Sequence, residues 1–140
     1  MPNGPADRGV AVFLHGGDYD RLHQGAAIAA AAAAADRPVE LFFFWWALAR
    51  LAEGGLARPE FPGRPDADEV AHRFEARGWP TAAALLASAR ETGRCRVHAC
   101  SASLEMLGLR PDAVEGFVDS ILGWSAILAR TAGVVDRFYL

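Results

Sequence analysis

The fold of this chain is decided by the stretch Val10-Ala-Val-Phe-Leu-His-Gly-Gly-Asp18. The five apolar residues 10–14 are followed, after His15, by two glycines. A short apolar run bounded by glycines is typical of a strand buried on both faces of a parallel sheet. Asp18 provides an N-cap for a helix over 19–35, whose second half consists almost entirely of alanine. Pro38 follows the helix, and the Phe-rich segment 39–44 predicts a second strand. This strand–helix–strand order predicts a right-handed βαβ unit.

The remainder of the chain continues the alternation of helices and strands. The Pro-rich segment 58–65 predicts a surface loop, because proline interrupts regular structure. We expect further helices at 45–53, 66–78, 80–92, 101–107 and 120–131, and further strands at 95–100, 114–118 and 134–140. The predicted architecture is a three-layer α/β/α sandwich with a mainly parallel sheet of four or five strands. One domain would cover residues 10–140, after a flexible N-terminus at residues 1–9.

Composition excludes several classes of function. The chain has 140 residues, 52% hydrophobic and 22% charged, which suits a globular domain with a core. A net charge of −3 gives no basic footprint, so we expect no nucleic-acid partner. All 14 basic residues are arginines, which excludes lysine Schiff-base chemistry. The polar N-terminal residues do not resemble a signal peptide, so we expect a cytoplasmic location.

Two very apolar segments raise the question of a membrane span. Residues 26–35 and 41–49 are each too short, since a spanning helix needs about 20 apolar residues. Joining them would bury the charges of Asp36, Arg37 and Glu40. We therefore predict no membrane span. Peripheral membrane contact through residues 42–46 stays open as an alternative.

Three short segments follow the predicted strands directly. They are His15-Gly16-Gly17-Asp18, Trp45-Trp46 and His98-Ala99-Cys100-Ser101. Ligands of open α/β sheets bind beyond the carboxyl ends of the strands, so these segments are the candidates for a site. The first and third segments would meet if the first and third strands were neighbours.

Cys100 is the candidate nucleophile of this chain. It lies where a strand passes into a helix, a place where unpaired backbone N–H groups favour a thiolate. The alternative is that Cys100 is a small buried hydrophobic residue. Cys95 lies five strand positions earlier, roughly 16 Å away. A disulfide requires Cα atoms within about 7 Å, so we expect no disulfide between the two cysteines.

Other side chains near these segments could support a reactive thiol or bind its substrate. His15 could exchange a proton near neutral pH, and His98 could do so or could pack inside the fold. Gly16 and Gly17 predict a tight turn or a close backbone approach. Trp46 is a candidate substrate contact or an interface residue. Zinc bound by His15, His98, Cys100 and Asp18 is a weak alternative without tight ligand spacing, so we expect no metal or cofactor.

The order of these features resembles the DsrE/DsrF/TusD-like family of sulfur-relay proteins, especially its peroxiredoxin-like branch. The resemblance is carried by Gly17-Asp-Tyr-Asp20, by Leu41-Phe-Phe-Phe-Trp-Trp46 and most specifically by Val97-His-Ala-Cys-Ser-Ala-Ser-Leu-Glu-Met-Leu-Gly108. It implies the α/β sandwich described above, assembled as a homo-oligomer, commonly a trimer or hexamer. It also implies that Cys100 carries sulfur as a persulfide.

The resemblance implies small sulfur-carrier or rhodanese-like proteins as partners. Supporting roles for His15 and Asp18, and substrate contacts by Gly16, Gly17, Trp46, His98 and Ser101, are our own predictions. Two other functions stay open: a non-catalytic subunit or small-ligand-binding module of the same fold, and a thiol redox sensor that forms a sulfenic acid.

Overall fold

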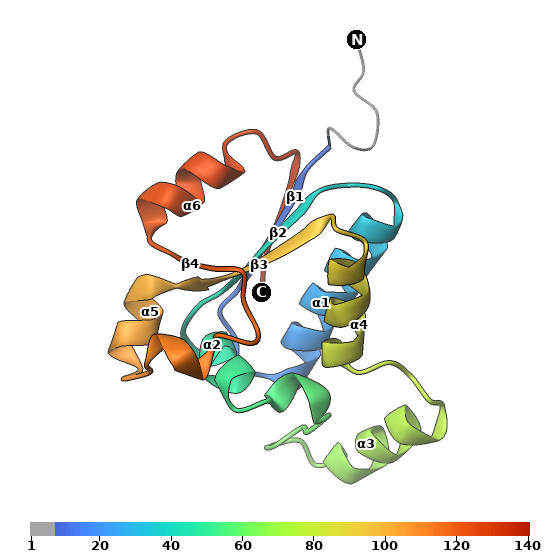
Figure 1. Cartoon of the computed structure of the whole chain (residues 1–140). Helices are drawn as coiled ribbons and strands as arrows, with labels where there is room; N and C mark the ends of the chain where they lie inside the picture. Colours follow the sequence, from blue (N-terminus) through green and yellow to red (C-terminus); the bar gives the residue numbers. More distant parts are fainter. Residues whose placement is uncertain (1–7) are drawn as a thin grey trace.

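The computed structural model describes residues 8–140 and contains one five-stranded, all-parallel sheet in the order β4-β3-β2-β1-β5 (Figure 1). The strands are β1 (Val10–Leu14), β2 (Val39–Phe43), β3 (Cys95–Cys100), β4 (Ser120–Leu122) and β5 (Asp136–Tyr139). The predicted α/β/α sandwich with a parallel sheet is therefore confirmed.

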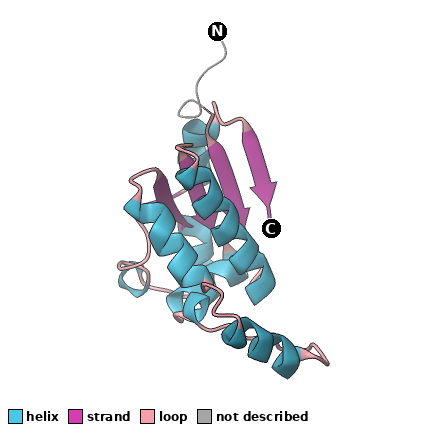
Figure 2. Ribbon diagram, turned by 90° about the vertical axis from the view of Figure 1, so that its right-hand side faces the viewer, coloured by secondary structure: helices cyan, strands magenta, loops and turns pink. Residues whose placement is uncertain are grey.

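Helices cover the two faces of the sheet unequally. They are α1 (Tyr19–Ala34), α2 (Trp45–Ala52), α3 (Ala67–Ala76), α4 (Ala82–Glu91), α5 (Ser101–Met106) and α6 (Trp124–Thr131), with short 3-10 turns η2 (Gly55–Ala57) and η3 (Pro111–Ala113). α1 and α4 pack side by side on one face, and α6 lies on the opposite face (Figures 1 and 2). We call these the α1/α4 face and the α6 face.

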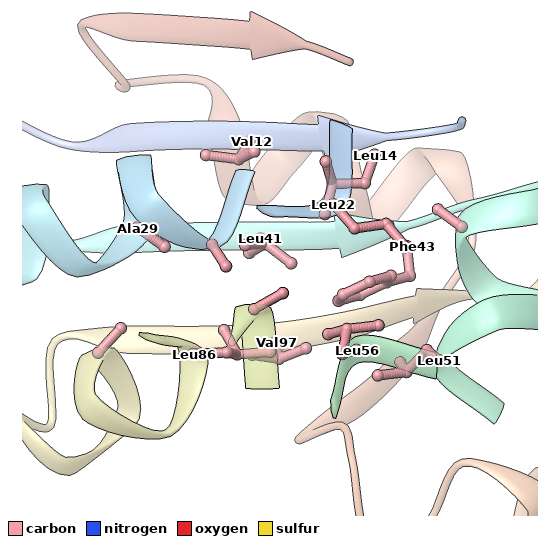
Figure 3. Close-up of a cluster of buried hydrophobic side chains, with 14 of the residues drawn as sticks. Val12, Leu14, Leu22, Ala29, Leu41, Phe43, Leu51, Leu56, Leu86 and Val97 are labelled. Carbon is pink, nitrogen blue, oxygen red and sulfur yellow. The ribbon is translucent and has the colours of Figure 1, made fainter. Parts of the chain in front are cut away.

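The α1/α4 face holds the larger core (Figure 3). Alternate residues of the central strands point into it, among them Val12, Leu41 and Val97, and none of the three is exposed by more than 1%. The alanine side chains of α1 let this helix lie close to the sheet. At Gly25, even a β-carbon would come within 2.5 Å of the Leu14 side chain. The buried alanines of α1, which are Ala26, Ala29, Ala32 and Ala33, suit this close helix-to-sheet packing.

The largest differences from the predicted elements lie between residues 114 and 131. Residues 114–118 form turns after η3 rather than a strand, and Val114 packs into the core from that turn. The fourth strand begins later because pairing with β3 starts at Asp119, whose backbone N–H donates to the carbonyl of Val97 at 2.7 Å. The predicted helix at 120–131 is consequently shorter, and α6 begins after Gly123.

The expected flexible N-terminus lies mostly outside the described residues, since the description begins at Arg8. Arg8 and Gly9, the last two residues of the predicted N-terminal segment, form hydrogen bonds with the rest of the fold. The carbonyl of Arg8 accepts a hydrogen bond from the Arg37 Nε at 2.8 Å, and the carbonyl of Gly9 accepts from the backbone N–H of Val135 at 2.9 Å.

Over residues 8–140, no helix has the length and apolar character needed to span a bilayer.

Candidate functional site

The carboxyl ends of β1, β2 and β3 lie at the same edge of the sheet. The loops after β1 and β3 were expected to meet if these strands were neighbours. β2 lies between the two strands, so the loops do not meet directly. Neighbouring strands are about 4.8 Å apart, which places the two loops roughly 10 Å from each other. The start of α2, with its two tryptophans, occupies the space between them.

Cys100 is the last residue of β3 and the N-cap of α5. Its side chain is 3% exposed and packs on the α6 face in a cluster that includes Phe42, Phe44 and Ile127. The thiol is free. The backbone N–H groups in the first turn of a helix have no partners within the helix, so they point toward the end of β3. The predicted position of Cys100 at a strand-to-helix junction is confirmed.

Cys95 occupies a contrasting position at the opposite end of the same strand. Because the two cysteines are five residues apart, their side chains point to opposite faces, and Cys95 packs in the α1/α4 core. Burial raises the pKa of the Cys95 thiol to about 12. Both cysteines are free, as predicted. Cys95 therefore stays a protonated thiol at neutral pH.

An aromatic layer covers the α6 face beside Cys100. The ring of Phe13 stacks on Phe42 with 5.2 Å between ring centroids and on Tyr139 with 4.7 Å. Phe44 stacks on Trp124 at 5.1 Å. The sequence analysis did not single out Trp124 as a site residue, because its contact with Phe44 depends on the path that α6 takes over the sheet.

His15 belongs to this aromatic layer. Its ring lies parallel to that of Phe44, with 4.4 Å between centroids and an interplanar angle of 9°. Burial lowers the pKa of His15 below its usual 6.5, so the neutral, proton-accepting form prevails at neutral pH. The structure brings His15 to the aromatic residue that also packs in the cluster of Cys100, and not to the cysteine directly.

The glycine loop after β1 lies against the start of α2. The backbone N–H of Ala47 donates to the carbonyl of His15 at 3.1 Å. A β-carbon on Gly17 would be 3.0 Å from the Trp46 carbonyl oxygen, and one on Gly16 would be 2.5 Å from Arg21 Cδ. The glycines thus serve a close approach of chain segments, one of the two roles predicted for them. Trp46 itself is exposed.

Trp45 has a backbone conformation that the sequence did not reveal. Its φ angle is 43°, in the left-handed region that residues with side chains rarely adopt. The chain turns there directly from β2 into α2. Strained backbone at the carboxyl edge of a sheet is often associated with a functional site.

Asp18 lies at the start of α1, on the α1/α4 face of the sheet, whereas Cys100 packs on the α6 face. It precedes the first turn of α1 and lines a hollow of about 390 Å³ together with Asp20, Glu60 and Phe61. Ser101, by contrast, is the first residue of α5 and lies next to Cys100. Its hydroxyl oxygen would be 3.4 Å from a β-carbon on Gly123.

His98 is fully buried, and both of its ring nitrogens are engaged. Nδ1 is 3.2 Å from the Ser120 hydroxyl, and Nε2 is hydrogen-bonded to a carboxylate oxygen of Glu40. Arg130 of α6 donates from Nε to the same oxygen at 3.0 Å. His98 therefore ties three strands and α6 together and leaves no ring nitrogen for the substrate contact that we predicted.

The charge of Glu40 is preserved in this network. Burial alone would raise the pKa of this carboxyl group, but the hydrogen bonds from His98 and Arg130 outweigh burial and hold the pKa below its usual 4.5. Glu40 and Arg130 were missed by the sequence analysis. The signal for Glu40 is its position two residues before Phe42, which places both on the α6 face of β2.

Within residues 8–140, no three His, Cys, Asp or Glu side chains gather in a way that could hold a metal ion. Comparisons of the chain with protein-family models and with curated proteins find no match.

Proposed function

We propose that this chain is a cytoplasmic sulfur-relay protein that carries sulfane sulfur as a persulfide on Cys100. The observation that supports the proposal most directly is the place of Cys100 at the carboxyl edge of the central strands, at the start of a helix. Both thiols are free, but only Cys100 lies at the carboxyl edge of the sheet, whereas Cys95 packs in the α1/α4 core at the opposite end of β3. The resemblance to the DsrE-like sulfur-relay family supports the same role.

The chemistry consists of two thiol exchanges. The Cys100 thiolate attacks the outer sulfur of a donor persulfide, the S–S bond of the donor breaks, and the donor leaves as a thiolate. Cys100 then carries one additional sulfur. An acceptor thiolate attacks this outer sulfur in the same way and regenerates the Cys100 thiolate, so neither step requires an external oxidant or reductant. Backbone N–H groups in the first turn of α5 stabilise the anion before and after transfer.

His15 and the aromatic layer would shape the environment of the transferred sulfur. His15 is neutral at neutral pH and is therefore available as a general base for a thiol proton. Its stacking on Phe44 keeps the ring at the rim of the site. Donors and acceptors of the proposed kind are small sulfur-carrier or rhodanese-like proteins. The exposed side chains of Trp46, Trp124, Leu128 and Tyr139 favour contact with such partners or with further copies of this chain in a trimer or hexamer.

A ligand-binding module of the same fold is the second candidate function. The hollow beside Asp18 favours it, because its volume of about 390 Å³ is that of a small-molecule pocket. Binding there would involve neither Cys100 nor the α6 face.

Intact-mass spectrometry tests the persulfide role. We would incubate the wild-type protein, Cys100→Ser and Cys95→Ser with thiosulfate, polysulfide or a persulfidated carrier protein. We expect the wild type and Cys95→Ser to gain the mass of one sulfur atom and to lose it when a reductant is added. Cys100→Ser should gain none. If the wild type takes up no sulfur from any of the donors, the carrier role is refuted and ligand binding becomes the leading function.

A further inference from the structure

Cys100 is almost fully buried although it ends a strand at the open edge of the sheet. Its 3% exposure cannot admit a donor persulfide carried by another protein, because the attacking sulfur must reach the Cys100 sulfur in line with the bond that breaks. Something that covers Cys100 has to move before exchange can occur. The α6 face shows which element that is.

α6 is attached to the sheet through few side chains. Of its eight residues, Ile127 and Thr131 are buried and the other six are exposed. Ile127 packs in the same cluster as Cys100. A helix with so little buried apolar surface belongs to the segments that open at low free-energy cost while the rest of the fold stays intact.

Trp124 packs on the aromatic rings of the cluster that contains Cys100. The chain enters α6 from Leu122, whose Cα is paired in register with that of Cys100. From that side of Cys100, the Trp124 indole reaches Phe44, which directly follows β2, at 5.1 Å, and Phe13 on β1, at 6.3 Å. Since β3 lies between β4 and β2, the chain from Leu122 to Trp124 passes the end of β3, where a β-carbon on Gly123 would be 3.4 Å from the Ser101 hydroxyl oxygen. The ring is 46% exposed, so its outer side faces solvent.

The far end of α6 is fastened by an ion pair and by a hydrogen bond from Arg137 Nη2 to the Thr131 carbonyl at 2.7 Å. Arg130 Nε donates to Glu40 on β2 at 3.0 Å, and Glu40 is held in place by the buried His98. Arg130 is partly exposed, so the pair is screened by solvent and easily broken. The two ends of α6 thus differ, with aromatic contacts to the cluster of Cys100 at the start and polar contacts near the end.

We propose that α6 is a gate over Cys100, closed by the stacking of Trp124 and fastened by the Arg130–Glu40 ion pair. Opening of α6 exposes the thiol on the α6 face and leaves the α1/α4 core unchanged. The purpose of this gate depends on the proposed sulfur relay, because it would admit a donor or acceptor thiol and shield the persulfide between exchanges. The opening itself can be measured without any sulfur donor.

The two cysteines of β3 allow a test in the unmodified chain. N-ethylmaleimide is added to the folded protein, samples are quenched over time, and peptide mass spectrometry measures the labelling of Cys100 and Cys95 separately. Local opening of α6 exposes Cys100 alone, whereas unfolding of the sheet exposes both cysteines. We expect Cys100 to be labelled at least about 100-fold faster than Cys95.

Variants identify the gate. Trp124→Ala and Arg130→Gln should each accelerate the labelling of Cys100 by about tenfold, with no change at Cys95. Trp79→Ala is the matched control, because Trp79 is also an exposed tryptophan but follows α3, away from the α6 face. It should leave both labelling rates unchanged.

Three results would overturn the gate. The first is equal labelling rates for the two cysteines, the second is no effect of either variant on Cys100, and the third is equal acceleration at both cysteines, which indicates global destabilisation. The persulfide role fails separately. If labelling is gated but no sulfur is taken up, the gate is supported and the sulfur-relay role is refuted. If sulfur is taken up without gated labelling, the relay role is supported and the gate is refuted.

Discussion

On one face of the sheet, α1 and α4 bury alternate residues of β1, β2 and β3 beneath a continuous layer of alanine and leucine, and Cys95 lies within it. On the other face, the eight residues of α6 lie over a layer of aromatic rings, and Cys100 lies at its margin. One strand thus holds two cysteines in different environments. Both cysteines are buried, so under the proposed gate the access of a reagent to each thiol depends on the helix that covers it.

The largest expected effect lies on the α1/α4 face. Leu41 on β2 is fully buried there, and Leu41→Ala removes apolar contacts and leaves a cavity. We expect it to lower the free energy of unfolding by about 3 kcal/mol. Leu128→Ala on the exposed side of α6 should change it by less than about 0.5 kcal/mol. Urea titration followed by circular dichroism measures both, and equal losses would contradict the contrast between the two faces.

Serine substitutions of the two cysteines should show the same contrast in stability, with the larger loss on the α1/α4 face. Cys95→Ser places a hydroxyl group in the apolar core and should cost about 2 kcal/mol. Cys100→Ser places serine at the N-cap of α5, a position where its oxygen can accept a hydrogen bond from the helix backbone, so we expect a change of about 0 to 1 kcal/mol in the stabilising direction. Thermal unfolding of the two variants provides the measurement. A larger loss for Cys100→Ser would show that the α6 face is the more tightly packed one.

A smaller effect is expected from the ion pair under α6, and it depends on pH. The folded-state pKa of Glu40 is below its usual 4.5, so the charged carboxylate contributes stability above that value and loses the contribution as the pH falls through the folded-state pKa. Glu40→Gln should cost about 1 kcal/mol near neutral pH. The difference from the wild type should shrink between about pH 5 and pH 3. Urea titrations at several pH values measure it, with Glu60→Gln as an exposed control. A difference that stays constant down to pH 3 would contradict the role of the Glu40 charge.

The parts of the fold that local patterns determine were predictable. The apolar runs at 10–14 and 39–44 identify strands buried on both faces, and the glycines and prolines between elements mark their ends. The segment 114–118 misled the prediction because Val114, Phe117 and Val118 favour strands, although the segment forms turns and Val114 packs into the core from there. Pairing with β3, a long-range contact, decides where β4 begins.

The candidate site was predictable only where one residue defines it. The position of Cys100 follows from the strand that precedes it and the helix that comes after it. The network of Glu40, His98 and Arg130 joins residues that are 58 and 90 positions apart, and no local spacing reveals such contacts. The position of Trp124 likewise depends on the crossover from β4 to β5, which carries α6 back across three strands.

The order of the strands also has a consequence for biosynthesis. β1 is synthesised first, but its partner β5 is synthesised more than 120 residues later, so this edge of β1 stays unpaired until the chain is nearly complete. The core under α1 and α4 can assemble once β3 has emerged. The rings of Phe13, Phe42 and Phe44 stay uncovered until α6 and β5 have followed. During that interval the nascent chain presents a sticky aromatic surface with an accessible Cys100, and this is the stage at which we expect chaperones to bind it and oxidants to reach its thiol.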